Sequence, residues 1–103
     1  MKTITKKDLT KYAAEFVNEK AYIIGKIMDG VFSSLRDIIT KTDDELRIEI
    51  RDFGVFEVKN TKPKLRARNP RTGETIYVPA RKKVHFKPGK LLKEVLKKPL
   101  KEE

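Results

Sequence analysis

Apolar residues near the start of the chain recur with the period of an amphipathic helix. They are preceded by Thr5 and Asp8, which have the spacing of a capping box with Asp in place of the usual Glu. Steps of three and one place the apolar side chains on a single stripe, so we predict a first helix that packs through it. Its apolar residues are Leu9, Tyr12, Ala13, Phe16 and Val17.

The pattern predicts a second, longer helix after Asn18, which is a candidate N-cap. Its main apolar residues step by 4, 3, 4 and 3 positions, which is the seam period of paired helices. This stripe is wider than one short helix can cover, so we expect a dimer built on it. The helix should end in the turn-forming residues 40–45. The seam comprises Ile24, Met28, Val31, Leu35 and Ile38, widened by Ile27, Phe32 and Ile39.

The period then changes to two, which is typical of strands. Residues 46–50 alternate between apolar and charged and predict a strand buried on one face. A tight turn around Gly54 should lead into a second strand through residues 56–58. Residues 84–86 predict a short third strand, and residues 91–96 predict a closing helix.

Residues 59–83 form a basic segment in which the strand pattern continues but the apolar face is lost. Four cations occupy every second position from Lys62 to Arg68, and in an extended strand they would project from one side. The turn sequence NPRTG at 69–73 and the GETIYV that overlaps its end predict a β-hairpin. A two-stranded ribbon without a core is marginally stable, so we expect it to be mobile until a partner orders it.

The charge of the chain is concentrated in this region. Formal net charge is +10. Eleven of the 25 Lys and Arg residues lie between Lys59 and Lys90, whereas only one of the 15 acidic residues lies there. A neutral body with one cationic segment indicates a footprint for a polyanion. Double-stranded DNA is the leading candidate, and folded RNA, for example in a ribosome-associated role, is the alternative. An anionic membrane fits least, because the segment has no apolar face to insert.

The residues give little support for catalysis. His85 is the only histidine, cysteine is absent, and no phosphate-loop or dinucleotide glycine pattern occurs, so we expect a non-enzyme without a cofactor. We interpret His85 as a packing or phosphate-contacting residue. The acidic residues 43–45 are interpreted as a solvated loop and not as a metal site, because no further ligand follows at calcium-loop spacing. The lack of cysteine and of an apolar leader favours a soluble cytoplasmic protein.

Three motifs carry a resemblance to a known family. DFGVFEV at 52–58, ARNPRTGE at 67–74 and HFKPGKLLKE at 85–94, in this order and spacing, resemble the HU and integration host factor family of bacterial DNA-bending proteins. The resemblance extends from about residue 3 to residue 96. It implies an α+β fold, an intertwined dimer with a helical body, a small antiparallel sheet and protruding β-ribbon arms. It also implies a nucleoid-associated protein that bends and compacts double-stranded DNA, as a homodimer or as a heterodimer with a paralogue.

On this basis the chain is predicted to be one domain with four segments. Residues 1–58 would form the helical dimerisation body and the first strands, and residues 59–83 the basic β-ribbon arm. Residues 84–98 would supply the closing strand and helix, and residues 99–103 a polar tail.

The resemblance assigns the central role to Pro70, which would intercalate between base pairs at the tip of the arm. HU and integration host factor are themselves among the proteins known to kink DNA with apolar wedges, so this role follows from the resemblance. Taken alone, NPRTG favours a simple turn; the cations on either side favour the wedge. Arg68, Asn69 and Arg71 would line the minor groove, where arginine is favoured.

The remaining predicted contacts are with the DNA backbone. Lys90 follows a proline and a glycine at a predicted helix N-terminus, where an anion is also favoured. The matching aromatic residues Phe53, Phe56 and Phe86 are assigned to the core of the body. Backbone contacts are assigned to Lys59, Lys62, Lys64, Arg66, Lys82 and Lys83 in the arm, and to Lys87 and Lys90 in the body.

Overall fold

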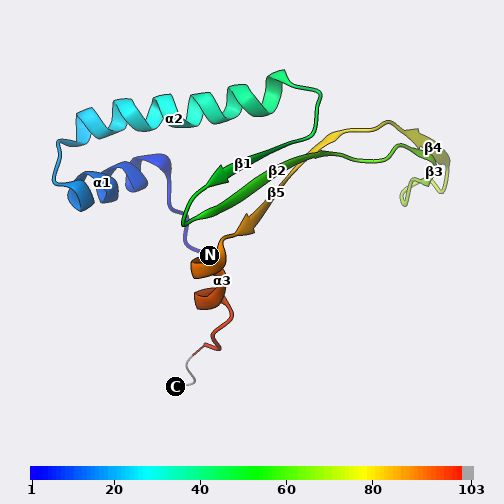
Figure 1. The fold of residues 1–103 in the computed structure, drawn as a ribbon. Helices are drawn as coiled ribbons and strands as arrows, with labels where there is room; N and C mark the ends of the chain where they lie inside the picture. The colour runs from blue at the N-terminus through cyan, green and yellow to red at the C-terminus, as the bar shows by residue number, and fades with distance from the viewer. Residues whose placement is uncertain (101–103) are drawn as a thin grey trace. The chain divides into compact units, whose positions relative to one another are not determined.

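The computed structural model describes residues 1–100, so the predicted polar tail of residues 99–103 lies partly outside the described range. Within that range the chain forms three helices and five strands (Figure 1). They belong to two compact units, one of Met1–Lys41 and one that begins at Thr42. The α+β class predicted from the sequence is confirmed, because helices occur together with antiparallel sheets.

The first unit is a pair of helices, α1 (Lys6–Val17) and α2 (Ala21–Lys41), which lie side by side (Figure 1). The predicted capping box is confirmed. The Thr5 hydroxyl accepts a hydrogen bond from the backbone N–H of Asp8 at 3.3 Å, and the Asp8 carboxylate accepts one from the backbone N–H of Thr5 at 3.1 Å. The Asp8 carboxylate also accepts a hydrogen bond from the Thr5 hydroxyl at 3.0 Å, and the two bonds that it accepts from Thr5 lower the pKa of Asp8.

The prediction that Asn18 begins the second helix is wrong. Asn18 is the C-cap of α1, with φ of 53° in the left-handed region, and its backbone N–H points to the carbonyls of Ala14 and Glu15. Asparagine adopts this conformation more readily than most residues, which suits it to end a helix. Three residues further on, α2 begins at Ala21, and it ends at Lys41, inside the predicted 40–45 segment.

Much of the apolar surface of the two helices is not covered by the helices themselves. Ala14 is the buried side chain of α1, and α2 contains none. Of the predicted seam, Val31 is 49% exposed and Ile38 is 47% exposed, while Phe16 on α1 is 83% exposed. Exposed apolar residues at helical spacing over two helices indicate a packing surface that the helix pair does not cover by itself.

The second unit contains a three-stranded antiparallel sheet in the order β1-β2-β5. Its strands are β1 (Leu46–Ile50), β2 (Gly54–Asn60) and β5 (Lys82–Pro88). All three strands were predicted, but β2 and β5 run further into the basic segment than the apolar alternation indicated. Lys59 on β2 and Lys83 on β5 are paired across the sheet, so both belong to it.

The turn between β1 and β2 is centred two residues earlier than predicted. Residues 51–53 form the turn, in which Asp52 has φ of 63°, and Gly54 is already the first residue of β2. A side chain on Gly54 would lie 2.6 Å from the carbonyl oxygen of Lys87 and 2.7 Å from the ring of Phe86. Close approach of β5, and not the turn, therefore requires glycine at this position.

The two faces of the sheet differ in character. Val58 is fully buried on one face, which also carries the half-buried Phe56 and Phe86. Phe53 lies in the preceding turn and is 47% exposed, so its predicted place in the core of the body stays a prediction. The ring of Phe86 lies 5.3 Å from that of Phe53 and 4.9 Å from that of Phe56, centroid to centroid. After the sheet, Gly89 caps α3 (Lys90–Leu96). The apolar face consists of Leu46, Ile48, Ile50, Phe56, Val58, Val84 and Phe86.

Candidate nucleic-acid interface

Between β2 and β5 the chain forms the predicted hairpin, a two-stranded antiparallel sheet of β3 (Lys64–Arg68) and β4 (Thr75–Val78). We call β3, β4 and the turn between them the ribbon (Figure 1). Two hydrogen bonds join the chain at its base. The N–H of Thr61 donates to the carbonyl of Arg81 at 2.7 Å, and the N–H of Arg81 donates to the hydroxyl of Thr61 at 2.9 Å.

The cations of the ribbon do not share one side, which corrects the prediction from their spacing. Lys62 lies before β3 begins. The register pairs Lys64 with Val78 but Arg68 with Thr75, and it shifts by one residue between Lys64 and Ala67. Cross-strand partners point to the same side, and Thr75 and Val78 are an odd number of positions apart on β4.

The consequence is that Lys64 and Arg68 lie on opposite faces of the ribbon. At the shift, Leu65 and Arg66 together stand against the single residue Tyr77, which is the pattern of a β-bulge. Basic side chains are therefore available on both faces of the ribbon.

The tip of the ribbon is organised by Asn69. Its N–H donates to the carbonyl of Glu74 at 2.8 Å, and its carbonyl accepts from the N–H of Gly73 at 2.7 Å. Its side-chain oxygen accepts from the N–H of Arg71 at 2.9 Å. Gly73 has φ of 74°, a conformation that favours glycine. The side-chain oxygen of Asn69, a residue predicted to line the minor groove, is thus engaged in holding the turn.

Pro70 is the first residue of this turn, and it is exposed. Its neighbours Arg68 and Arg71 are exposed as well. The hydrogen bonds on either side hold the backbone around Pro70 in one conformation, and proline has no N–H that needs a partner. A rigid apolar residue thus stands at the tip between two exposed guanidinium groups.

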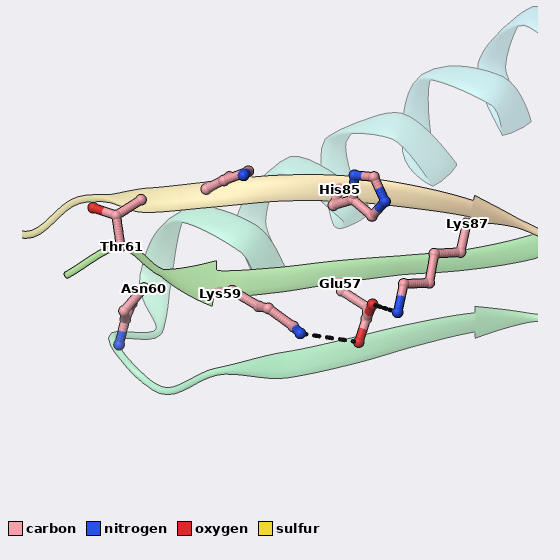
Figure 2. A pocket seen from close by; sticks show the side chains of 7 residues that line it. Glu57, Lys59, Asn60, Thr61, His85 and Lys87 are labelled. Atoms are coloured by element: carbon pink, nitrogen blue, oxygen red, sulfur yellow. Dashed lines mark ion pairs between the residues drawn. The ribbon is translucent and has the colours of Figure 1, made fainter.

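The polar face of the three-stranded sheet is the second basic surface. The register places Arg47 and His85 directly opposite Glu57, on either side of it. Glu57, Lys59, His85 and Lys87 line a hollow of about 450 Å³. Figure 2 shows these side chains on β2 and β5. We call this surface the charged face; it consists of Arg47, Glu49, Glu57, Lys59, Lys83, His85 and Lys87.

Glu57 is the buried member of the charged face, with an exposed fraction of 9%. Its Oε1 lies 2.6 Å from Nζ of Lys87, and its Oε2 lies 3.8 Å from Nζ of Lys59. The contact with Lys87 is the main cause that lowers the pKa of Glu57, against the opposing effect of burial. The sequence interpretation missed Glu57, whose only local signal is a charged residue between Phe56 and Val58.

Lys82 and Lys83 were both predicted to contact the DNA backbone, but their side chains point to opposite faces of the sheet. Lys82 pairs with Asn60 and so points to the face opposite that of Lys83. Its Nζ lies 3.7 Å from Asp43 Oδ1. The neighbouring Glu45 accepts a hydrogen bond from the N–H of Asn60 at 3.1 Å. The acidic loop thus contacts the point where β2 and β5 leave the sheet.

Lys90 lies at the N-terminus of α3, as predicted, and it is exposed. None of the helices in the described range is both long and apolar enough to cross a membrane. Residues 1–100 also contain no group of three or more His, Asp and Glu side chains that could hold a metal ion.

Known proteins resemble the chain over nearly its whole length. The profile of the family described as "Bacterial DNA-binding protein" matches residues 4–97. The probable DNA-binding protein HU of Chlamydia pneumoniae is 34% identical over 100 residues, which cover 96% of this chain and 96% of that protein. Integration host factor subunit alpha of Bordetella pertussis is 35% identical over 98 residues, covering 95% of this chain and 83% of that protein. Among solved structures, a cocrystal structure of Anabaena HU with DNA has a TM-score of 0.76 at 24% identity, covering 93% of this chain and all of that one.

Proposed function

Because this chain belongs to the family of bacterial DNA-binding proteins, we propose that it is an architectural protein that binds double-stranded DNA as a dimer and bends it. The observation that carries the proposal is Pro70, exposed on a hydrogen-bonded tip between Arg68 and Arg71. Such a tip can enter the minor groove, where arginine meets the most negative potential. The proline ring can then insert between adjacent stacked base pairs and unstack them, which kinks the duplex.

The basic residues behind the tip would stabilise the kinked duplex by binding its phosphates. A kinked duplex curves toward the protein, so its phosphates come within reach of lysines on the charged face. Lys59, Lys83 and Lys87 share that face and are exposed. Lys62, Lys64, Arg66 and Lys90 would contact the backbone elsewhere, and Lys82 would do so if its contact with Asp43 is exchanged for a phosphate.

A dimer would supply the apolar core that one chain lacks. Ala14 and Val58 are the buried apolar side chains of the described residues, which is too small a core for a domain of this size. A second copy that covers the exposed faces of α1 and α2 would complete the core and provide a second ribbon. We propose a homodimer, because it is the simplest such assembly. We further propose that it acts at the nucleoid in the cytoplasm, without enzymatic activity and without a cofactor.

The proposal is tested by energy transfer between dyes on the two ends of a short DNA duplex titrated with the protein. The dyes should approach as the protein saturates the duplex. If about 6–10 phosphates are neutralised, affinity should fall by about 10³–10⁵ between 50 and 200 mM salt. Binding without approach of the ends, or preferential displacement of the duplex by structured RNA, would reject the bending function.

A further inference from the structure

An acidic side chain in the centre of a phosphate-binding surface weakens that surface, so the position of Glu57 requires an explanation. Glu57 lies between Arg47 and His85 across the sheet, on the same face as Lys59, Lys83 and Lys87. It is 9% exposed, which is uncommon for glutamate unless the carboxylate is paired. A residue that served only to fill space would not need a charge at this point.

The two carboxylate oxygens of Glu57 face two different lysines from two different strands (Figure 2). Lys87 comes from β5 and Lys59 from β2. Both lysine side chains are 58% exposed, whereas the Glu57 side chain is 12% exposed. The lysines therefore remain accessible while the carboxylate beneath them is shielded. The ammonium group of Lys87 has three N–H donors, so its hydrogen bond to Glu57 leaves two for a phosphate, and Lys59, at 3.8 Å, is held by charge attraction alone.

We propose that Glu57 is a positioning residue that fixes the ammonium groups of Lys59 and Lys87, and so makes the charged face select duplexes that curve onto it. The inference rests on the proposed function. A free lysine can swing on its four-carbon stem to meet the phosphates of a straight duplex. A lysine held by Glu57 meets only phosphates that are brought to it, and the carboxylate repels a backbone that approaches without a matching ammonium group.

The test compares Glu57→Gln with wild type on an intact duplex and on a duplex with a central nick, which bends at lower cost. Wild type should prefer the nicked duplex. Glu57→Gln should bind the intact duplex about threefold tighter, the order expected for removing one repulsive charge at a wet surface. Its affinity for the nicked duplex should change less, so the preference should shrink by about the same factor.

Glu49→Gln is the matched control, because Glu49 belongs to the charged face but pairs with Arg47 instead of the two lysines. It should shift both affinities equally and leave the preference unchanged. In a double-mutant cycle, Glu57→Gln should have little effect on the preference once Lys87→Gln is present. Thermal unfolding of each variant checks that it is folded. If Glu57→Gln does not fold, Glu57→Asp keeps the charge but shortens the reach, and it should shrink the preference as well.

The outcomes separate this inference from the function on which it rests. Equal effects of Glu57→Gln and Glu49→Gln on the preference, or additive effects in the cycle, would mean that Glu57 acts only through bulk charge and would overturn the inference. A wild-type protein that bends DNA but binds intact and nicked duplexes equally would also overturn it, while leaving the proposed function in place. A wild-type protein that neither binds nor bends a duplex would reject both.

Discussion

Lys64 and Arg68 are four residues apart on β3, yet they project from opposite faces of the ribbon, because β3 carries one residue more than β4 between them. Only one face of a two-stranded ribbon can point into a groove at a time. With Arg68 next to the tip, we expect its face to enter the minor groove, while Lys64 reaches the phosphates that border it. We therefore predict that Arg68 contributes to DNA bending, whereas Lys64 contributes only charge.

We expect two alanine variants of the ribbon to differ in their effect on the bend angle of DNA. Lys64→Ala should weaken binding to intact and nicked duplexes by the same factor and reduce the salt slope by about 1. Arg68→Ala should reduce the slope by a similar amount and also lower the bend angle, because it removes a contact inside the groove. Salt titrations and end-to-end energy transfer measure both effects. Identical behaviour of the two variants would contradict the assignment of faces.

Pro70→Ala should reduce bending much more than it reduces binding. Alanine lacks the rigid ring that unstacks the base pairs, whereas the cations that hold the backbone remain. We expect Kd for an intact duplex to rise less than about tenfold, since electrostatic contacts supply most of the affinity. Energy transfer at saturation reports the bend.

Pro79→Ala is the control for the proline itself, because Pro79 is exposed, follows β4 and lies away from the tip. It removes the same ring from the same basic segment and should leave bending unchanged. Full bending by Pro70→Ala, or an equal loss with Pro79→Ala, would show that Pro70 is not the wedge.

Gly54→Ala should destabilise the protein by about 1–3 kcal/mol, the usual cost of overpacking. The added Cβ would lie 2.6 Å from the backbone carbonyl oxygen of Lys87, which cannot move without distorting β5. Gly30→Ala is the control, because a Cβ there meets nothing within 4 Å and the residue lies inside α2. It should be neutral or stabilise by about 0.5–1 kcal/mol. Chemical unfolding compares them, and equal stability of Gly54→Ala and wild type would refute the packing argument.

The sequence predicts features of this fold that depend on local spacing. The helical stripe after Asp8 and the alternation at residues 46–50 are read from neighbours along the chain, and both elements form as predicted. Asn18 was misassigned because asparagine is suited both to an N-cap and to a left-handed C-cap, and its neighbours do not decide between them. The hairpin was predicted from NPRTG, since turn residues also act locally.

Features that depend on pairing between strands were not accessible in this way. The side to which Lys64 points is set by its register with Val78, and one extra residue in β3 reverses it relative to Arg68. The role proposed for Glu57 depends on Lys87, which is 30 positions further along the chain. Lys87 Nζ lies 2.6 Å from Glu57 Oε1. A glycine such as Gly54 can be explained from the sequence by a turn or by close packing. Only the position of β5 in the structure shows that close packing is the reason.

Assembly of two chains should be coupled to folding, because α2 has no buried residue in the single chain. For a folded dimer, each tenfold dilution should lower Tm by about 3–6 °C, since mass action favours the separated chains. Val31→Asp, on the predicted seam and 49% exposed, should abolish this dependence by preventing association. Ser33→Asp adds the same charge on the opposite side of α2 and should leave Tm and its dependence on concentration unchanged. Calorimetry and sedimentation over a range of concentrations measure both effects. A Tm independent of concentration in wild type would show that a second copy does not cover the exposed seam.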